Sequence, residues 1–168
     1  MKFLPTENII YKTRLKEDEI INRLSGFIEP KKTFRFGIFS SGSAKSYEGQ
    51  INGKKFKIKR IIGYRNSFLP RIDGIIEREF DGLTIKVKMR LHIFVIVFLC
   101  IWCGGVGLAC IAFLTQVFNH SGFNPVALIP FGMLIFVYAL TMGGFKFESR
   151  KSKKDLQNIF EADIVEGF

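Results

Sequence analysis

The chain lacks charged side chains over one long stretch. None of its 25 Lys and Arg or 15 Asp and Glu residues falls between Leu91 and Phe145. That stretch holds two apolar runs, residues 93–113 and 126–145, which would measure roughly 31 and 30 Å as helices. Because the hydrocarbon core of a bilayer is about 30 Å thick, the sequence predicts a two-helix transmembrane hairpin over residues 92–145.

Positive charge is also missing from the connector between the two runs. Of the 25 basic residues, 20 precede the first run and 5 follow the second. Cytoplasmic flanks retain Lys and Arg, so we expect a multi-pass protein of the inner (plasma) membrane with both termini in the cytoplasm. The whole net charge of +10 lies in residues 1–91, which favours anionic lipid as a partner. Nucleic acid is an unlikely partner, because no recognition motif accompanies the basic residues.

Cysteine is scarce and is missing from the soluble parts. The three cysteines, Cys100, Cys103 and Cys110, all fall in the first apolar run, which excludes a disulfide framework. Cys100 and Cys103 form a C-x-x-C pair, but no neighbouring cation is available there to lower a thiol pKa. We therefore expect packing rather than redox chemistry, no metal and no cofactor. With no catalytic constellation elsewhere, we predict that the protein is not an enzyme.

Small residues form a seam on each predicted membrane helix. At 100° per residue, each set falls within one arc of its helix. The two sets are Cys100, Cys103, Gly107 and Cys110, and Gly132, Ala139 and Gly143. Small residues let membrane helices approach closely. The seams could pack against each other, or one could serve a second copy or another membrane protein.

The first 91 residues have the pattern of an α+β domain. We expect an antiparallel β-meander of about five strands with one N-terminal helix. Asn52-Gly53 and Asp81-Gly82 indicate two hairpins with type I′ turns. Residues 8–13 form a short β-like run, the strands of the meander are expected at residues 33–39, 47–51, 54–61, 72–80 and 83–91, and the predicted helix covers residues 16–25.

The last predicted strand alternates and leads directly into the first membrane helix. Its buried face is expected to hold Leu83, Ile85, Val87, Met89 and Leu91. Lys86, Lys88 and Arg90 face the other way, and we expect them to provide electrostatic attraction to the leaflet.

A third region, residues 146–168, is predicted to be a cytoplasmic tail. Residues 145–150 are expected to be extended. A short amphipathic helix should follow, with Ser152 as its N-cap and an apolar stripe of Leu156, Ile159 and Phe160. That helix is too short to be stable alone, and we expect it to dock on the domain rather than on the bilayer.

The loop between the hairpins holds the candidate binding residues. Arg60, Arg65 and Arg71 surround Asn66 and Phe68, and three guanidinium groups with an amide could grip a phosphate or carboxylate. Phe68 could insert at an interface. Alternatively, the loop caps the sheet edge and its arginines are solvated.

Two segments and the two spans that follow them carry a resemblance to known proteins. The segments are Gly63-Tyr-Arg-Asn-Ser-Phe-Leu-Pro70 and Lys86-Val-Lys-Met-Arg-Leu-His92. In these segments the chain resembles a group of small uncharacterised bacterial two-span membrane proteins with an N-terminal β-rich cytoplasmic domain. At the level of layout it is also similar to membrane-attached pleckstrin-homology-like proteins. The resemblance implies a layout and no activity.

Two functions from different classes remain open. The first is a non-enzymatic binding or scaffolding module at the inner leaflet that takes a protein partner or anionic lipid. The second is a homo-oligomeric channel, or an accessory transporter subunit, assembled through the small-residue seams.

Overall fold

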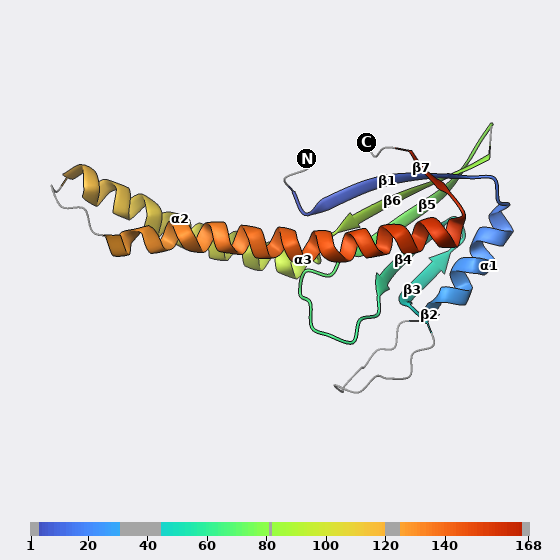
Figure 1. The fold of residues 1–168 in the computed structure, drawn as a ribbon, viewed down its shortest axis with the longest axis horizontal. Coiled ribbons are helices and arrows are strands. Elements are labelled where there is room, and N and C mark those ends of the chain that lie inside the picture. The colour runs from blue at the N-terminus through green and yellow to red at the C-terminus, as the bar shows by residue number, and fades with distance from the viewer. Residues whose placement is uncertain (1–3, 31–44, 81, 120–124, 166–168) are drawn as a thin grey trace.

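The computed structural model describes residues 4–30, 45–80, 82–119 and 125–165. It is an α+β protein with one mixed sheet and two long apolar helices (Figure 1). The elements are β1 (Thr6–Thr13), α1 (Glu17–Phe27), β2 (Ile28–Pro30), β3 (Tyr47–Asn52), β4 (Lys55–Arg60), β5 (Arg71–Glu79), β6 (Gly82–Arg90), α2 (Ile93–Asn119), η1 (Pro125–Leu128), α3 (Ile129–Phe160) and β7 (Asp163–Val165).

The sheet has seven strands in the order β2-β3-β4-β5-β6-β1-β7. Strands β3 to β6 pair in sequence order and antiparallel, so both predicted hairpins are present. The prediction of a wholly antiparallel sheet was wrong at one edge, where β2 runs parallel to β3. Strand β7, which the sequence did not predict, pairs with β1. The predicted strand 33–39 lies outside the described residues.

The first hairpin turns one residue later than the sequence predicted. Asn52 pairs with Lys55, so Gly53 and Lys54 form the loop. Gly53 has a φ of 56°, and Asn52 has no positive φ, which excludes the predicted type I′ turn on Asn52-Gly53. In the second hairpin Glu79 pairs with Gly82, and Asp81 lies outside the described residues.

Helix α3 replaces two predicted elements. It runs unbroken for 32 residues, so the expected extended piece over residues 145–150 was wrong, and the short amphipathic helix is its last part. A helix of this length measures about 48 Å, which exceeds a hydrocarbon core of about 30 Å by roughly 12 residues. The prediction failed because the end of an apolar run is not a signal for the end of a helix. The residues become polar there, but the helical backbone continues.

The C-terminal part of α3 covers one face of the sheet. Phe145, Leu156 and Phe160 are fully buried there and pack with residues of β1, β4, β5 and β6 in one core. The predicted buried face of β6 is confirmed, since all five of its residues are at most 6% exposed. The tail thus belongs to the core of the sheet domain.

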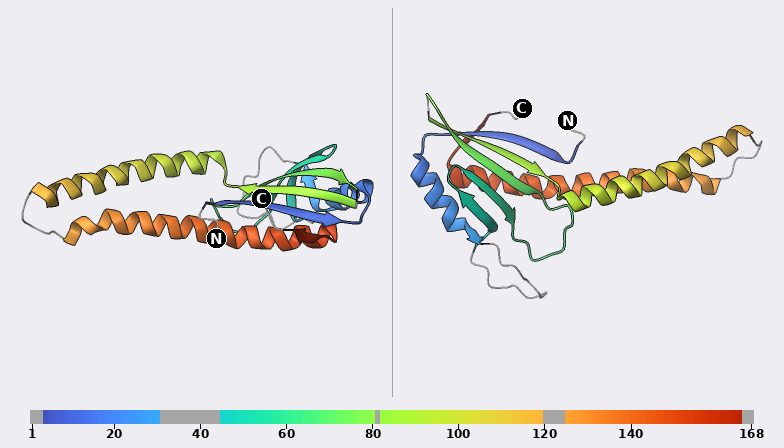
Figure 2. Two further views of the ribbon diagram at one scale, coloured as in Figure 1. Left: turned by 90° about the horizontal axis from the view of Figure 1, so that it is seen from above. Right: turned by 180° about the vertical axis from the view of Figure 1, so that it is seen from behind.

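Helices α2 and α3 lie antiparallel and extend away from the sheet as a long arm (Figure 2). Both are long and apolar enough to cross a membrane. Only 6% and 11% of their most apolar windows are buried in the protein, so these side chains are not core residues. Helix α1 lies at the opposite end of the sheet (Figures 1 and 2).

Candidate functional site

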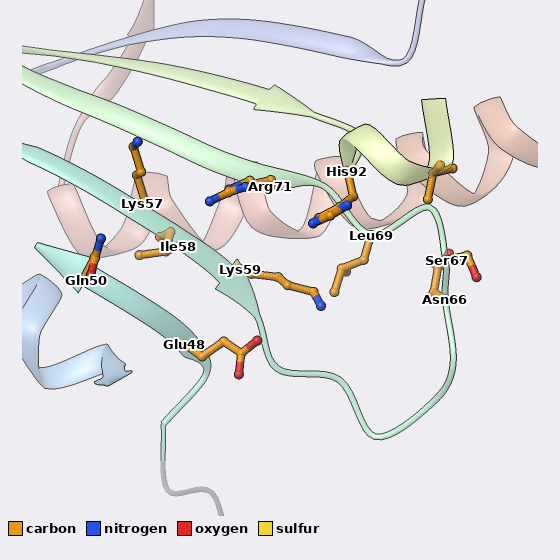
Figure 3. A pocket seen from close by; sticks show the side chains of 11 residues that line it. Glu48, Gln50, Lys57, Ile58, Lys59, Asn66, Ser67, Leu69, Arg71 and His92 are labelled. Carbon is orange, nitrogen blue, oxygen red and sulfur yellow. The ribbon is translucent and has the colours of Figure 1, made fainter. Parts of the chain in front are cut away.

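A groove lies where the sheet meets the first turn of α2. It has a volume of about 460 Å³ and is bordered by β3 and β4, the loop before β5, and the start of α2. Figure 3 shows the side chains that line it. They are Glu48, Gln50, Lys57, Ile58, Lys59, Asn66, Ser67, Leu69, Arg71, His92 and Val95. Three of them are permanently cationic and one is acidic.

The cations of this groove belong to the sheet face that α3 leaves open. Strand alternation turns Phe56 and Ile58 toward α3 and turns Lys57 and Lys59 to the other side. Strand pairing then places Lys59 opposite Arg71, and Arg71 opposite Arg90. A row of three cations therefore crosses β4, β5 and β6 at the end of the sheet nearest α2. Like charges directly opposite each other destabilise a sheet.

Some basic residues on this open face form ion pairs and others do not. Lys86 pairs with Glu77 at 2.6 Å, and Arg90 pairs with Asp73 at 2.9 Å. The hydrogen bond to Glu77 raises the pKa of Lys86. Across the ranges that the structure describes, Lys57, Lys59 and Arg71 have no ion-pair partner. The groove thus holds three cations without an ion pair and one carboxylate, Glu48, which lies opposite Lys59 in the strand register.

His92 brings the start of α2 to the groove. Its Nδ1 accepts a hydrogen bond from the backbone N–H of Phe94 at 3.4 Å, and its ring stacks on the Phe94 ring. A neutral imidazole that accepts at Nδ1 carries its proton on Nε2. His92 is therefore a hydrogen-bond donor at the rim of the groove.

The structure separates the predicted loop residues instead of gathering them. Arg71 lines the groove, whereas Arg60 faces α3 and Arg65 is exposed. Asn66 donates to the carbonyl oxygen of Gly144 at 3.4 Å and accepts from the N–H of Phe68 at 2.9 Å. Phe68 packs against the core, close to Gly144. The loop is docked on α3, and its predicted contact roles stay predictions.

Glu148 fixes this docking. Its carboxylate is fully buried on α3, and it accepts from the hydroxyl of Tyr64 and from Arg60 Nη1 at 3.4 Å. Arg60 also lies 3.6 Å from Asp155, which accepts from Tyr47 at 3.1 Å. The bond to Glu148 raises the pKa of Tyr64, and burial raises that of Tyr47. This set of side chains ties α3 to β3, β4 and the loop.

The sequence did not identify Glu148 as important. A single Glu after an apolar run is ordinary at a membrane boundary, and its partners lie 84 and 88 residues away in the chain. The role of Lys57 and Lys59 was also missed, although their alternation with Phe56 and Ile58 was a signal that they share an exposed face.

The predicted helix seams do not meet at their glycines. A Cβ added to Gly107, Gly132 or Gly143 would have no atom within 4 Å, apart from its own helix. Gly132, Ala139 and Gly143 are exposed. On α2, Cys110 is buried, Cys103 is partly buried and Cys100 is exposed. A role for these residues in helix packing with another chain stays a prediction.

Over the described part of the chain, no three His, Cys, Asp or Glu side chains come together as a set that could hold a metal ion. Comparison with protein-family models, curated proteins and solved structures finds no match for this chain.

Proposed function

We propose that the protein is a non-enzymatic binding module of the inner membrane, with α2 and α3 as its two spans and both termini in the cytoplasm. The sheet domain would then lie at the cytoplasmic leaflet. The lopsided placement of Lys and Arg and the exposed apolar surface of both helices support this arrangement.

The observation that carries the proposal is the continuity of α3 from the apolar arm into the core of the sheet domain. A second connection is equally short, since only Leu91 and His92 separate β6 from α2. Two connections without a flexible linker hold the domain in one orientation. A fixed orientation suits a module that must present one surface at the leaflet.

That surface is the open face of the sheet. Helix α3 covers the other face, so the groove and its unpaired cations remain accessible (Figure 3). Lys57, Lys59 and Arg71 are the residues we expect to contact the occupant. Lys88 is exposed on the same face and adds to its positive potential.

Topology is tested with reporters at both termini. Alkaline phosphatase fused to either end should be inactive, because it would remain in the cytoplasm, and green fluorescent protein at the same ends should fluoresce. Active phosphatase at either end, or a protein that stays in solution without detergent, would disprove the arrangement.

Occupancy of the open face is tested by lysine acetylation in native membrane vesicles and in detergent. Lys59 should react more slowly in membranes than in detergent. Lys55 is the matched control, because it lies on the same strand and face, about 13 Å farther from α2. Equal slowing of both lysines would argue against a binding role for the groove.

A channel or an accessory transporter subunit is the second candidate. The exposure of Gly132, Ala139 and Gly143 on α3 favours it, since close helix contacts between copies use such residues. Cross-linking through the exposed Cys100 in membranes would give a dimer if the protein assembles.

A further inference from the structure

We infer that the groove between β4, β5 and the start of α2 binds the phosphate of an anionic lipid headgroup. This inference rests on the proposed membrane placement and adds the chemistry of the occupant. It assigns Lys57, Lys59 and Arg71 to the phosphate and His92 to the rim of the site.

The arrangement of charge calls for an anion. Lys59 and Arg71 lie directly opposite each other on neighbouring strands, and neither forms an ion pair within the described ranges, although Glu48 on β3 lies opposite Lys59 on its other side. The same face pairs Lys86 and Arg90 with acidic residues on β5. Because repulsion between opposed cations costs stability, an anion bound between Lys59 and Arg71 would relieve it.

The donors suit phosphate. Arg71 supplies a planar fork of N–H groups that matches two phosphate oxygens, and Lys57 and Lys59 supply point charges beside it. Nε2–H of His92 adds a donor from α2. Glu48, the one acidic lining residue, repels an anion at its own edge of the groove, so the site is placed on the Arg71 and His92 side (Figure 3).

The surroundings select a lipid over a soluble phosphate. Val95 and Leu69 line the groove next to the cations, and Ile93 and Phe94 are exposed at the same end of α2. Helix α2 enters its apolar part there, so the groove opens where headgroups meet acyl chains. A lipid would place its phosphate on the cations and its first methylene groups against Val95.

The test uses the full chain in detergent, with phosphatidylglycerol or phosphatidylcholine added, and counts bound lipid by native mass spectrometry. The wild-type chain should retain one phosphatidylglycerol in preference to phosphatidylcholine. The double variant Lys59→Gln/Arg71→Gln should bind phosphatidylglycerol about tenfold more weakly or worse.

The matched control is Lys16→Gln/Lys55→Gln. It removes the same charge from the sheet domain, but neither residue lines the groove, and both lie toward the end of the sheet away from α2. It should bind within about twofold of wild type, since it removes no direct contact. The thermal unfolding midpoint of each variant without lipid verifies folding, and loss of the opposed cations should not lower it.

Equal weakening in both double variants would mean general attraction to the basic domain and would overturn the site. No preference for phosphatidylglycerol would also overturn it. If inorganic phosphate displaces the lipid at low millimolar concentration, the lipid assignment is wrong and a soluble phosphate is the occupant. Each of these outcomes leaves the topology result unchanged, so the failure of this inference is separable from failure of the proposed function.

Discussion

At the scale of single residues, Glu148 stands out because glutamate side chains are usually exposed, whereas this one is fully buried. A glutamate is almost never fully buried unless it is paired, and this one has two partners, Arg60 at the end of β4 and Tyr64 in the loop that follows. Removing a charged acceptor from a buried site leaves its donors without a partner. Glu148 is therefore the residue whose loss should most weaken the contact between α3 and the sheet.

We expect Glu148→Ala to lower the free energy of unfolding by about 2 kcal/mol, because it leaves Tyr64 without its acceptor and the half-buried Arg60 with only its 3.6 Å contact to Asp155. Glu148→Gln keeps an acceptor for Tyr64 and should cost less. Thermal unfolding of the full chain in detergent measures both. Glu161→Gln is the control: its pair with Arg23 is exposed, so little change in stability is expected. Equal losses in the alanine variant and this control would refute a structural role for Glu148.

Two tyrosines make stability depend on alkaline pH. Burial raises the pKa of Tyr11 and Tyr47 well above the ordinary value of about 10, and the charge of Asp155 adds to this effect at Tyr47. Between the unfolded and the folded pKa, the folded chain binds more protons, so its stability falls as pH rises. The contribution is fully present below about pH 10 and is lost above it.

The unfolding midpoint should therefore fall more slowly with rising pH in Tyr47→Phe than in wild type. The variant should begin about 1 kcal/mol less stable at neutral pH, because it loses the hydrogen bond to Asp155. Tyrosinate absorbance, followed with pH, should show late titration of the phenols of Tyr11 and Tyr47. Identical slopes in the two proteins would contradict this explanation.

At the scale of elements, α3 combines an apolar part long enough to cross a membrane with a C-terminal part that covers the sheet, and the loop before β5 is fastened to it at Gly144. A Cβ at Gly144 would lie 3.0 Å from Phe68 Cδ2 and 3.3 Å from Phe68 Cβ, whereas a Cβ at Gly143 would meet open space. These neighbours form a matched pair for testing whether the loop is docked.

Gly144→Ala should destabilise the full chain by about 1 kcal/mol, because Phe68 has to move away from a crowded position. Gly143→Ala should be neutral or slightly stabilising, since alanine favours the helix. Thermal unfolding and proteolysis of the loop report both effects. A gain of equal size in the two variants would show that Phe68 does not pack on α3.

The two hairpins and the buried face of β6 could be predicted from the sequence, because alternation and Gly-containing turns are local signals. Strands β2 and β7 have three residues each, which is too short for a pattern, and they depend on neighbours far away in the chain. The uninterrupted course of α3 was missed because Gly143, Gly144 and the charges after them resemble an end. For the groove, Asn66 and Arg71 were among the predicted contact residues, but their grouping with Lys57, Lys59 and His92 requires the strand register.

At the scale of the whole molecule, one end of the sheet domain adjoins the apolar arm formed by α2 and α3 (Figure 2). The groove lies at that end, and α1 lies at the other, where Glu17 pairs with Lys54 and Arg78 (Figure 1). Strand β6 has nine residues, so the two ends are about 30 Å apart.

A fluorophore on Ser67 should be quenched strongly by a quencher attached to lipid headgroups, and one on Asp18 should be quenched little. Each label is attached to a chain whose three cysteines are replaced by alanine, and the labelled protein is reconstituted in vesicles. Both positions are exposed, so labelling should not disturb the core. Similar quenching at the two positions would mean that the sheet lies flat on the bilayer or moves freely on it.

The covering of the sheet by α3 also has a consequence for biosynthesis. The strands β1 to β6 leave the ribosome first, and the C-terminal part of α3, which covers Tyr11, Phe56 and Ile72, is made only after α2 and the apolar part of α3. During translation the nascent sheet therefore exposes an apolar surface until the C-terminal part of α3 has been made. If α2 and α3 span a membrane as proposed, their insertion precedes completion of the core, and a chain truncated before residue 146 should be a substrate for chaperones and proteases.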